Sequence, residues 1–250
     1  MPVTVSAESQ WLYPDMPAGA GALSTTRSGG VSVGPYASMN LAVHVGDRPA
    51  AVAQNRRLLL DESGCSAIQW LTQVHGSRCI LATHASATGA PEADAAWTEE
   101  PGLALAVLTA DCVPVVLCAL NGSAVAVAHA GWRGLVAGVL AATVDAMPVA
   151  PGALQAWIGP AIGPASYEVG EDVFHAARGV MAEAEAFFAA AAGSGKYQLD
   201  LAGFARQQLR QLGVRAVLGD DICCAADERF FSFRRDGVTG RMATLAWLDG

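Results

Sequence analysis

The middle of the chain alternates between long apolar runs and short polar breaks. Residues 103–120, LALAVLTADCVPVVLCAL, and residues 123–132, SAVAVAHAGW, are rich in Val, Leu and Ala, a pattern typical of buried strands. The dipeptide Asn121-Gly122 separates the two runs, and it is a strong signal for a two-residue hairpin turn. The pattern therefore predicts a β-hairpin at the centre of the protein.

The predicted hairpin also fixes which side chains share a face. With a two-residue turn, Cys112 faces Gly131 and His129 faces Pro114, so Cys112 and His129 are diagonal neighbours on one face. Such neighbours lie roughly 7–8 Å apart at the backbone, close enough for a thiolate and an imidazole to share one metal ion. Pro114 cannot donate to a strand ladder, which favours an edge strand or a bulge.

Helical periodicity and loop composition organise the rest of the chain. We expect one helix over residues 131–147, buried on both sides, and an amphipathic helix over 204–212. Residues 183–200 are expected to form an Ala-rich helix that stops at Gly-Ser-Gly, followed by a linker. The Gly-, Ser- and Pro-rich residues 14–40 are expected to be ordered loops, some of which line a site.

The 250 residues fit one large domain or two small ones, and a hydrophobic content of 52% is enough for a core that folds alone. Charged residues make up only 15% and the net charge is −8, which argues against nucleic acid as a partner. The N-terminus shows no export signal, and no apolar run is long enough to span a membrane, so we expect a soluble cytoplasmic protein. The six cysteines include no CxxC pair and are expected to be free thiols.

A third candidate metal ligand stands outside the hairpin. His75 ends the apolar stretch in WLTQVHGSRCI, where we expect a ligand at a strand terminus. Together with Cys112 and His129 it gives two imidazoles and one thiolate, a set typical of catalytic zinc sites that leave a fourth position open. The alternative is that each histidine is an ordinary hydrogen-bonded residue.

Six ordered motifs then connect the sequence with a known family. They are STTRSGGVSVGPYASMNLAVHVGD, TQVHG, TADCVPV, AHAGWRG, IGPAIGPASYEVG and FFSFRRDGVTGRMA. Over nearly its whole length the chain resembles the YfiH-like, laccase-domain proteins, which have been described as polyphenol oxidases, purine nucleoside phosphorylases and peptidoglycan editing factors. The resemblance implies a single catalytic domain over residues 1–250 with an α+β fold, in which mixed sheets are covered by helices in an α/β/β/α-like arrangement.

The resemblance also implies a chemistry. In that family the histidine of TQVHG, the cysteine of ADC and the histidine of HAGWRG bind zinc, which maps onto His75, Cys112 and His129 as catalytic residues. The implied reactions are phosphorolysis of adenosine, inosine, guanosine and methylthioadenosine, and hydrolytic deamination of adenosine. Purine nucleosides and phosphate are the expected partners.

Further residues are candidates for substrate or phosphate binding. Arg133 follows His129 where the predicted helix begins, a setting that suits phosphate, although a structural salt bridge explains it equally well. Asn40, His44 and Arg27 fall in the first motif and are expected to line the pocket, unless Asn40 caps a turn and His44 is a surface residue. Asp111 is expected to orient the backbone, and Arg234, Arg235 and Arg241 to form structural ion pairs.

Three alternative functions remain open at this stage. A copper-dependent polyphenol oxidase needs many more histidines than the five present, many of them in His-X-His pairs, although copper can bind the same three ligands in vitro. A metal-free hydrolase with Cys112 as nucleophile and His129 as base leaves His75 without a role. A role in peptidoglycan precursor editing, with a muropeptide precursor as substrate, fits a hydrolytic site.

Overall fold

The computed structural model describes residues 10–192, 195–219 and 221–250, so part of the N-terminal segment and part of the expected 183–200 helix lie outside the described residues. Within these ranges two β-sheets stack on each other. The four-stranded sheet has the order β1 (Ala20–Ser24), β13 (Met242–Leu248), β5 (Leu103–Thr109), β2 (Ala67–Gln69). The six-stranded sheet has the order β12 (Ala216–Leu218), β8 (Leu154–Ile158), β6 (Val113–Ala119), β7 (Val125–Ala130), β4 (Ala95–Thr98), β3 (Cys79–Leu81).

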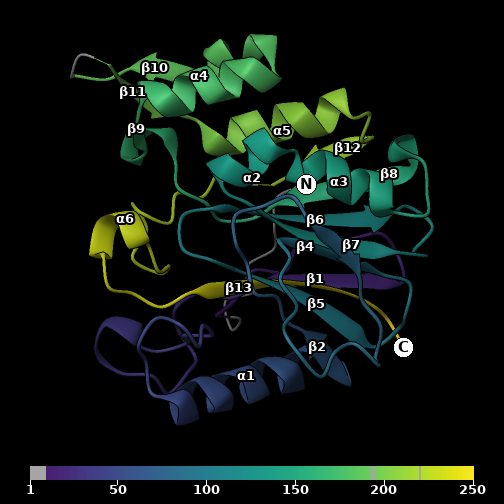
Figure 1. Cartoon of the computed structure of the whole chain (residues 1–250). Helices are drawn as coiled ribbons and strands as arrows, with labels where there is room; N and C mark the ends of the chain where they lie inside the picture. The colour runs from purple at the N-terminus through teal and green to yellow at the C-terminus, as the bar shows by residue number, and fades with distance from the viewer. Residues whose placement is uncertain (1–9, 193–194, 220) are drawn as a thin grey trace.

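Helices cover both outer faces of this pair of sheets (Figure 1). The helices are α1 (Pro49–Ser63), α2 (Trp132–Ala137), α3 (Val139–Ala146), α4 (Glu171–Val180), α5 (Leu201–Gln211) and α6 (Phe233–Asp236). The short 3-10 segments are Gly34–Tyr36, Pro151–Ala153, Pro164–Ser166 and Ala182–Phe187. A small third sheet, β10 (Phe188–Ala190), β11 (Lys196–Leu199) and β9 (Glu168–Gly170), lies beside α4. The predicted α+β arrangement of mixed sheets between helical layers is confirmed.

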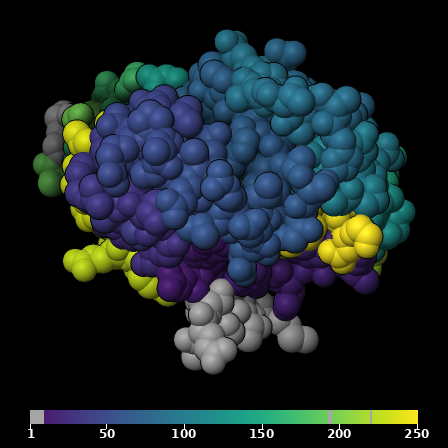
Figure 2. Space-filling model, turned by 90° about the horizontal axis from the view of Figure 1, so that it is seen from below, coloured from purple at the N-terminus to yellow at the C-terminus, as the bar shows by residue number. Residues whose placement is uncertain are grey.

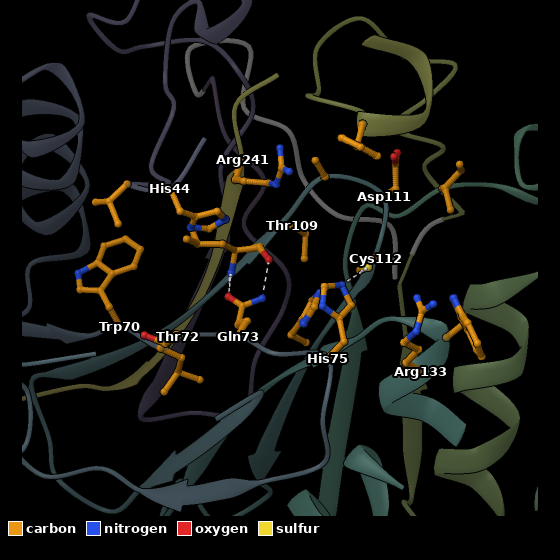
Figure 3. Close-up of a pocket in the computed structure, with 18 of the residues that line it drawn as sticks. His44, Trp70, Thr72, Gln73, His75, Thr109, Asp111, Cys112, Arg133 and Arg241 are labelled. Atoms are coloured by element: carbon orange, nitrogen blue, oxygen red, sulfur yellow. Dashed lines mark hydrogen bonds between the residues drawn. The ribbon is translucent and has the colours of Figure 1, made fainter. Parts of the chain in front are cut away.

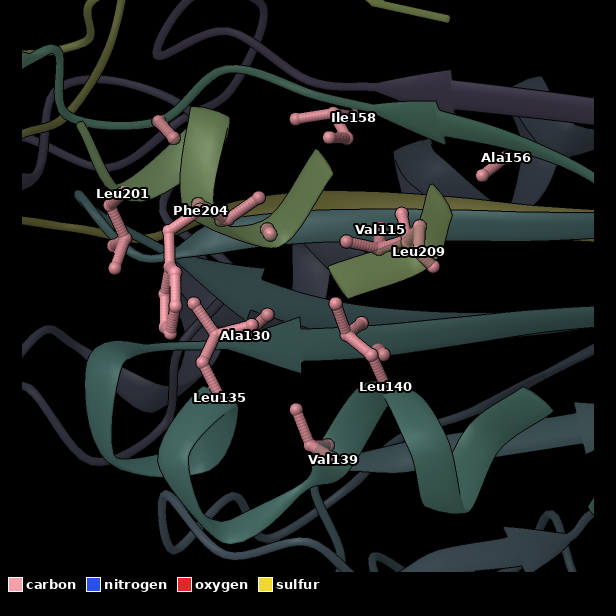
Figure 4. Packing of buried hydrophobic residues seen from close by; sticks show 14 of the residues in the cluster. Val115, Ala130, Leu135, Val139, Leu140, Ala156, Ile158, Leu201, Phe204 and Leu209 are labelled. Carbon is pink, nitrogen blue, oxygen red and sulfur yellow. The ribbon is translucent and has the colours of Figure 1, made fainter. Parts of the chain in front are cut away.

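Side-chain alternation along the central strands builds three apolar layers. In β5, Leu105 and Val107 pack between the two sheets, whereas Ala104 and Leu108 face the layer that contains Leu59 of α1. On the outer face of the six-stranded sheet, side chains of β6, β7 and β8 meet those of α2, α3 and α5 (Figure 4). Seen from below, α1 and other N-terminal segments form much of the surface (Figure 2). The facing sides of the two sheets therefore form one apolar layer between them. Strand β7, which carries His129, contributes side chains to this layer.

The predicted hairpin register is confirmed. Val113 pairs with Ala130 and Pro114 with His129, in the antiparallel register that a turn at Asn121-Gly122 imposes. The expectation that Pro114 marks an edge strand or a bulge is wrong, because β6 is a central strand between β7 and β8. Pro114 is tolerated because it is only the second residue of β6 and lies beyond the end of the β8 ladder, which starts at Val115.

Three local expectations need correction. The helix expected over 131–147 breaks into α2 and α3 at Gly138, whose φ of 87° lies in the left-handed region. In place of the Ala-rich helix, Ala182–Phe187 forms a 3-10 segment, and Phe188–Ala190 and Lys196–Leu199 form strands. Residues 14–40 contain strand β1 as well as loops. By contrast, α5 confirms the amphipathic helix, with Leu201, Phe204, Ala205 and Leu209 buried.

The structure also bears on the state of the cysteines and on the presence of membrane-spanning helices. All six cysteines are free thiols, as expected. Among the described residues no helix has the length and apolar character needed to cross a membrane.

Candidate metal and substrate site

Cys112 lies in a tight turn that carries the chain from one sheet to the other. Strand β5 ends at Thr109 in the four-stranded sheet, and β6 starts at Val113 in the six-stranded sheet. Asp111 takes a left-handed conformation in this turn, with φ of 98°. Its carboxylate accepts hydrogen bonds from Ser232 Oγ at 2.6 Å and from the backbone N–H of Arg234 at 2.6 Å. Asp111 thus ties the turn to the C-terminal segment, in keeping with the expected orienting role.

His75 lies in a loop, so the expectation that it ends a strand is wrong. It lies between β2 and β3 with φ of 61°, an unusual conformation for a residue with a side chain. The buried carboxylate of Asp94 accepts hydrogen bonds from the backbone N–H groups of Val74, His75 and Gly76, at 3.1, 2.9 and 2.7 Å. Those three bonds hold the loop in the conformation that directs His75 towards Cys112.

The same carboxylate also orients the third member of the cluster. His129 Nδ1 lies 2.8 Å from Asp94 Oδ1, and His129 is 3% exposed. The backbone N–H of His129 donates to the Asp94 carbonyl at 2.7 Å. A carboxylate on Nδ1 fixes the ring and leaves Nε2 as the atom that can bind a metal, which is the arrangement common behind metal-ligating histidines.

His75, Cys112 and His129 converge on one point. Each offers one ligand atom, and these atoms all lie within 4.8 Å of one another. Cys112 Sγ is 3.9 Å from His75 Nε2, and the two imidazole rings meet edge to face with centroids 4.7 Å apart. Gly131 makes room for this approach, because a Cβ at that position would lie 2.9 Å from Cys112 Sγ. The diagonal arrangement of Cys112 and His129 predicted from the hairpin is therefore compatible with binding of one metal ion by both side chains.

The charges of the cluster support metal binding. Burial opposes ionisation of Cys112, but the neighbouring imidazoles of His129 and His75 outweigh it and lower the pKa of the thiol to about 6. Burial likewise opposes charging of His129, yet the Cys112 thiolate and the Asp94 carboxylate raise its pKa to about 9. The site thus favours a thiolate, the form of cysteine that binds metal. Two imidazoles and one thiolate are a donor set that fits zinc, and imidazole and thiolate also bind copper.

The cluster forms one side of a pocket of about 670 Å³. Figure 3 shows His75, Cys112 and Arg133 at one end and His44, Trp70 and Arg241 towards the other. The size is in the range of pockets that bind small molecules and cofactors.

The middle of the pocket is uncharged. Gln73 donates to the Leu108 carbonyl at 2.8 Å and accepts from the Leu108 N–H at 2.7 Å, so its amide stabilises the wall. Thr109 Oγ1 is buried, lines the pocket and has no hydrogen-bond partner among the described residues.

Four arginines line the pocket, although the protein as a whole is acidic. They are Arg56, Arg133, Arg234 and Arg241. Within the described part of the chain none of the four forms an ion pair, whereas Arg235 pairs with Asp236 at 2.7 Å. The expectation of a structural ion pair therefore holds for Arg235 and is wrong for Arg234 and Arg241. Unpaired guanidinium groups in a pocket suit an anionic ligand.

The remaining predicted residues divide between the pocket and its support. His44 and Arg133 line the pocket. Arg27 and Asn40 do not: the Arg27 guanidinium stacks over Phe231 at 4.9 Å, and Asn40 is fully buried. Asn40 caps a turn through the Ala42 N–H at 3.1 Å and also accepts the Arg241 N–H at 3.0 Å. Both residues support the loops next to the pocket.

Several functional candidates escaped the sequence analysis. Asp94 follows the stretch Pro-Glu-Ala, and only its position directly before the apolar residues Ala-Ala-Trp distinguishes it. Tyr167 and Gln73 lie within or beside quoted motifs, but nothing in the local pattern indicates that they line the pocket. Their positions depend on how distant segments meet.

Comparison with known proteins places this geometry in a family. A family model described as multi-copper polyphenol oxidoreductase laccase matches residues 21–249. The chain belongs to this laccase-domain family. The purine nucleoside phosphorylase YfiH of Escherichia coli is 45% identical over 241 residues, covering 96% of this chain and 97% of the relative. A purine nucleoside phosphorylase of Pseudomonas aeruginosa is 47% identical over 242 residues, covering 96% of this chain and 98% of the relative.

Solved structures agree with the laccase-domain assignment. A protein of Neisseria meningitidis shares 46% sequence identity and a TM-score of 0.92, covering 97% of this chain and 100% of its own. YlmD from Geobacillus stearothermophilus shares 34% identity and a TM-score of 0.93, covering 99% of both chains. These structures therefore share the layered fold of this chain over nearly its whole length.

Proposed function

We propose that this laccase-domain protein is a purine nucleoside phosphorylase. The observation that carries the proposal is the joint presence, in one pocket, of a His-Cys-His cluster and unpaired arginines, in a chain 45–47% identical to proteins named for this activity. Phosphorolysis joins a neutral nucleoside to a phosphate anion and yields a free base and a ribose 1-phosphate. A pocket with an uncharged middle and cationic ends suits that pair of substrates.

Arg133 is the proposed phosphate-binding residue at the metal end. It is exposed, it stacks over Trp132 at 4.4 Å, and no hydrogen bond or ion pair occupies its guanidinium within the described residues. Because α2 has only six residues, the side chain, more than the helix dipole, supplies the attraction for the anion. A guanidinium presents paired N–H donors that match phosphate oxygens.

His75, Cys112 and His129 are the proposed metal ligands, and zinc is the metal that this donor set favours. When bound, zinc supplies Lewis acidity towards a substrate oxygen or a water molecule. The contribution of the chain itself is to keep Cys112 ionised and to hold His129 by Asp94.

The nucleoside is proposed to occupy the uncharged middle of the pocket. Thr109 Oγ1 is the free hydrogen-bonding group there. Tyr167 also lines the pocket; burial and the nearby Cys112 raise its pKa to about 12, so its hydroxyl stays protonated and able to donate. The proposed substrates are adenosine, inosine, guanosine and methylthioadenosine, with hydrolytic deamination of adenosine at the same site.

Kinetics of an Arg133→Ala variant test the proposal. Deamination uses water and needs no anion, so the variant should raise the KM for phosphate and lower inosine cleavage while sparing adenosine deamination. Loss of a charge-assisted contact typically costs about 1.5–3 kcal/mol, which corresponds to a roughly ten- to hundredfold loss of phosphorolysis.

Thermal melts supply the control for this experiment. If Arg133 only stabilises the Gly-Trp-Arg-Gly turn, both activities and Tm should fall together, which would exclude it from the phosphate site. If the wild-type protein converts none of the nucleosides, with or without phosphate, the proposed function itself is wrong.

A further inference from the structure

The pocket continues away from the metal cluster into a second cationic region, which we call the arginine lobe. It is formed by His44, Arg56, Trp70 and Arg241, which come from the N-terminal loops, α1, the segment before His75 and the residue just before β13. Figure 3 shows His44, Trp70 and Arg241 grouped on the side of the pocket opposite Arg133. The arginine lobe is therefore a second end of the same pocket.

Arg56 is fixed in the lobe by contacts that leave most of its donors free. Its guanidinium lies over the Trp70 ring at 3.8 Å, and Nε donates to the Leu41 carbonyl at 2.9 Å. Neither terminal nitrogen has an acceptor among the described residues. Burial lowers the pKa of Arg56 to about 10, which still leaves it charged at neutral pH. A half-buried cation without an anion is costly unless a ligand supplies one.

Arg241 is held in a similar way. Its Nη1 donates to the carbonyls of Thr239 and Gly240, at 3.0 and 2.9 Å, and no carboxylate pairs with it in the described structure. Arg56 and Arg241 both lie close enough to His44 to lower its pKa, after the larger effect of burial. Three basic side chains thus converge on one region. The one carboxylate among the described residues of the pocket lining, Asp111, accepts hydrogen bonds from Ser232 and from the Arg234 N–H and forms no ion pair with Arg241.

From this arrangement we infer that the arginine lobe is a second oxyanion subsite, which binds a phosphate group at the end of the pocket opposite Arg133. The inference rests on the proposed function in one respect: a nucleoside and one phosphate leave the second cationic end without a use. The phosphate can be inorganic phosphate, or it can be an ester on the ribose of the substrate. Fixed guanidinium groups recognise the same oxygens in both cases.

Calorimetric titrations without turnover test the subsite. The probes are inorganic phosphate, adenosine and adenosine 5′-monophosphate, each added to the metal-loaded wild type and to Arg56→Met, which keeps a long apolar stem against Trp70. Arg57→Met is the matched control, because Arg57 is the next residue of α1, is exposed and does not line the pocket. Arg133→Met tests the other end of the pocket.

The expected result is a roughly ten- to hundredfold weaker binding of a phosphate group at the arginine lobe in Arg56→Met, with phosphate binding at Arg133, adenosine binding and the Arg57→Met variant little changed. Weaker binding of adenosine 5′-monophosphate alone identifies an ester phosphate as the occupant, and weaker binding of inorganic phosphate as well identifies the free ion. The inference is overturned if Arg56→Met and Arg57→Met bind all probes alike, or if adenosine loses as much as its phosphate ester.

A second variant guards against a folding defect. Arg56→Lys keeps the charge but loses the bond to Leu41, so it should retain most of the phosphate-group binding. If Arg56→Lys melts like the wild type and yet binds as poorly as Arg56→Met, the assignment based on charge is wrong. Because no turnover is measured, a protein without phosphorylase activity that still shows Arg56-dependent binding would refute the proposed function and leave this inference intact.

Discussion

At the scale of single residues, Asp94 links two of the three proposed ligands. Its carboxylate accepts from the N–H groups around His75 and from the His129 ring, so one buried side chain sets both a loop conformation and a ring orientation. Without it, the left-handed backbone at His75 loses the bonds that offset its strain. Asp94 is thus a positioning residue, and its effect should be measurable in metal binding.

Asp94→Asn is expected to weaken zinc binding by about 10- to 100-fold, the usual effect of removing a carboxylate behind a ligating histidine. Cys112→Ala, which removes a ligand outright, should lose stoichiometric zinc. Elemental analysis of protein purified without added metal, followed by competition with a chelator, measures both. Full zinc retention in Cys112→Ala would show that the metal is bound elsewhere.

The lowered pKa of Asp94 also predicts that the free energy of unfolding depends on pH in the acid range. Burial alone would raise its pKa, but the bonds from His129 and from Gly76 lower it below the usual 3.8. A group with a lowered folded pKa stabilises the protein above its ordinary pKa, and this contribution is lost as the pH falls through the lowered value. In metal-free protein, the difference in unfolding free energy between wild type and Asp94→Asn should therefore be largest between about pH 4 and about pH 6.5 and shrink below that range. It should also shrink at higher pH, because the carboxylate raises the pKa of His129 and this contribution is lost as the pH rises to about 9. Urea titrations on both sides of the range measure the difference; a gap that widens as the pH falls below about 4 would contradict the assignment.

At the scale of elements, short-range signals predicted some structures well and others poorly. The register of β6 and β7 followed from Asn121-Gly122 because a two-residue turn leaves no freedom in the pairing. The helix predicted over residues 183–200 is wrong, because the pairing of β10 with β11 outweighs the helix propensity of the alanines. The metal cluster could be proposed from Cys112 and His129, whereas Asp94 and the arginine lobe depend on contacts between distant segments.

The break between α2 and α3 gives a prediction about stability. Gly138 has φ of 87°, and a Cβ added there would have no atom within 4 Å, so Gly138→Ala introduces backbone strain without a steric clash. The left-handed conformation costs roughly 1–2 kcal/mol for a residue with a Cβ, and Tm should fall accordingly. Gly152→Ala is the control, because it also has open space but no positive φ. Equal melting temperatures for the two variants would show that the junction relaxes freely.

At the scale of the whole molecule, the layered fold brings a group of potential metal ligands to the side of a large pocket. The described residues contain a single group of three or more potential ligands that includes histidine, and this is too few for the multiple coppers of a laccase. The described residues thus offer no second ligand group to match the words 'multi-copper' in the description of the family model.

Phenol oxidation, if it is observed, should depend on added copper and vanish in metal-free buffer. The reason is that the His-Cys-His cluster can take up copper in vitro but offers no second copper site among the described residues. Oxygen uptake with a phenolic substrate, measured before and after dialysis against a chelator, checks this. Stoichiometric, tightly held copper with sustained turnover would overturn the expectation.

The turn from β5 into β6 has a consequence for how the protein acquires its metal. Cys112 sits where the chain leaves one sheet for the other, while His75 and His129 belong to segments held together through Asp94. A nascent chain in which β4 has not yet paired with β7 keeps His75 and Asp94 apart from Cys112 and His129, so it cannot offer all three donors to the same ion. We therefore expect metal to enter only after the six-stranded sheet has formed, late in biosynthesis.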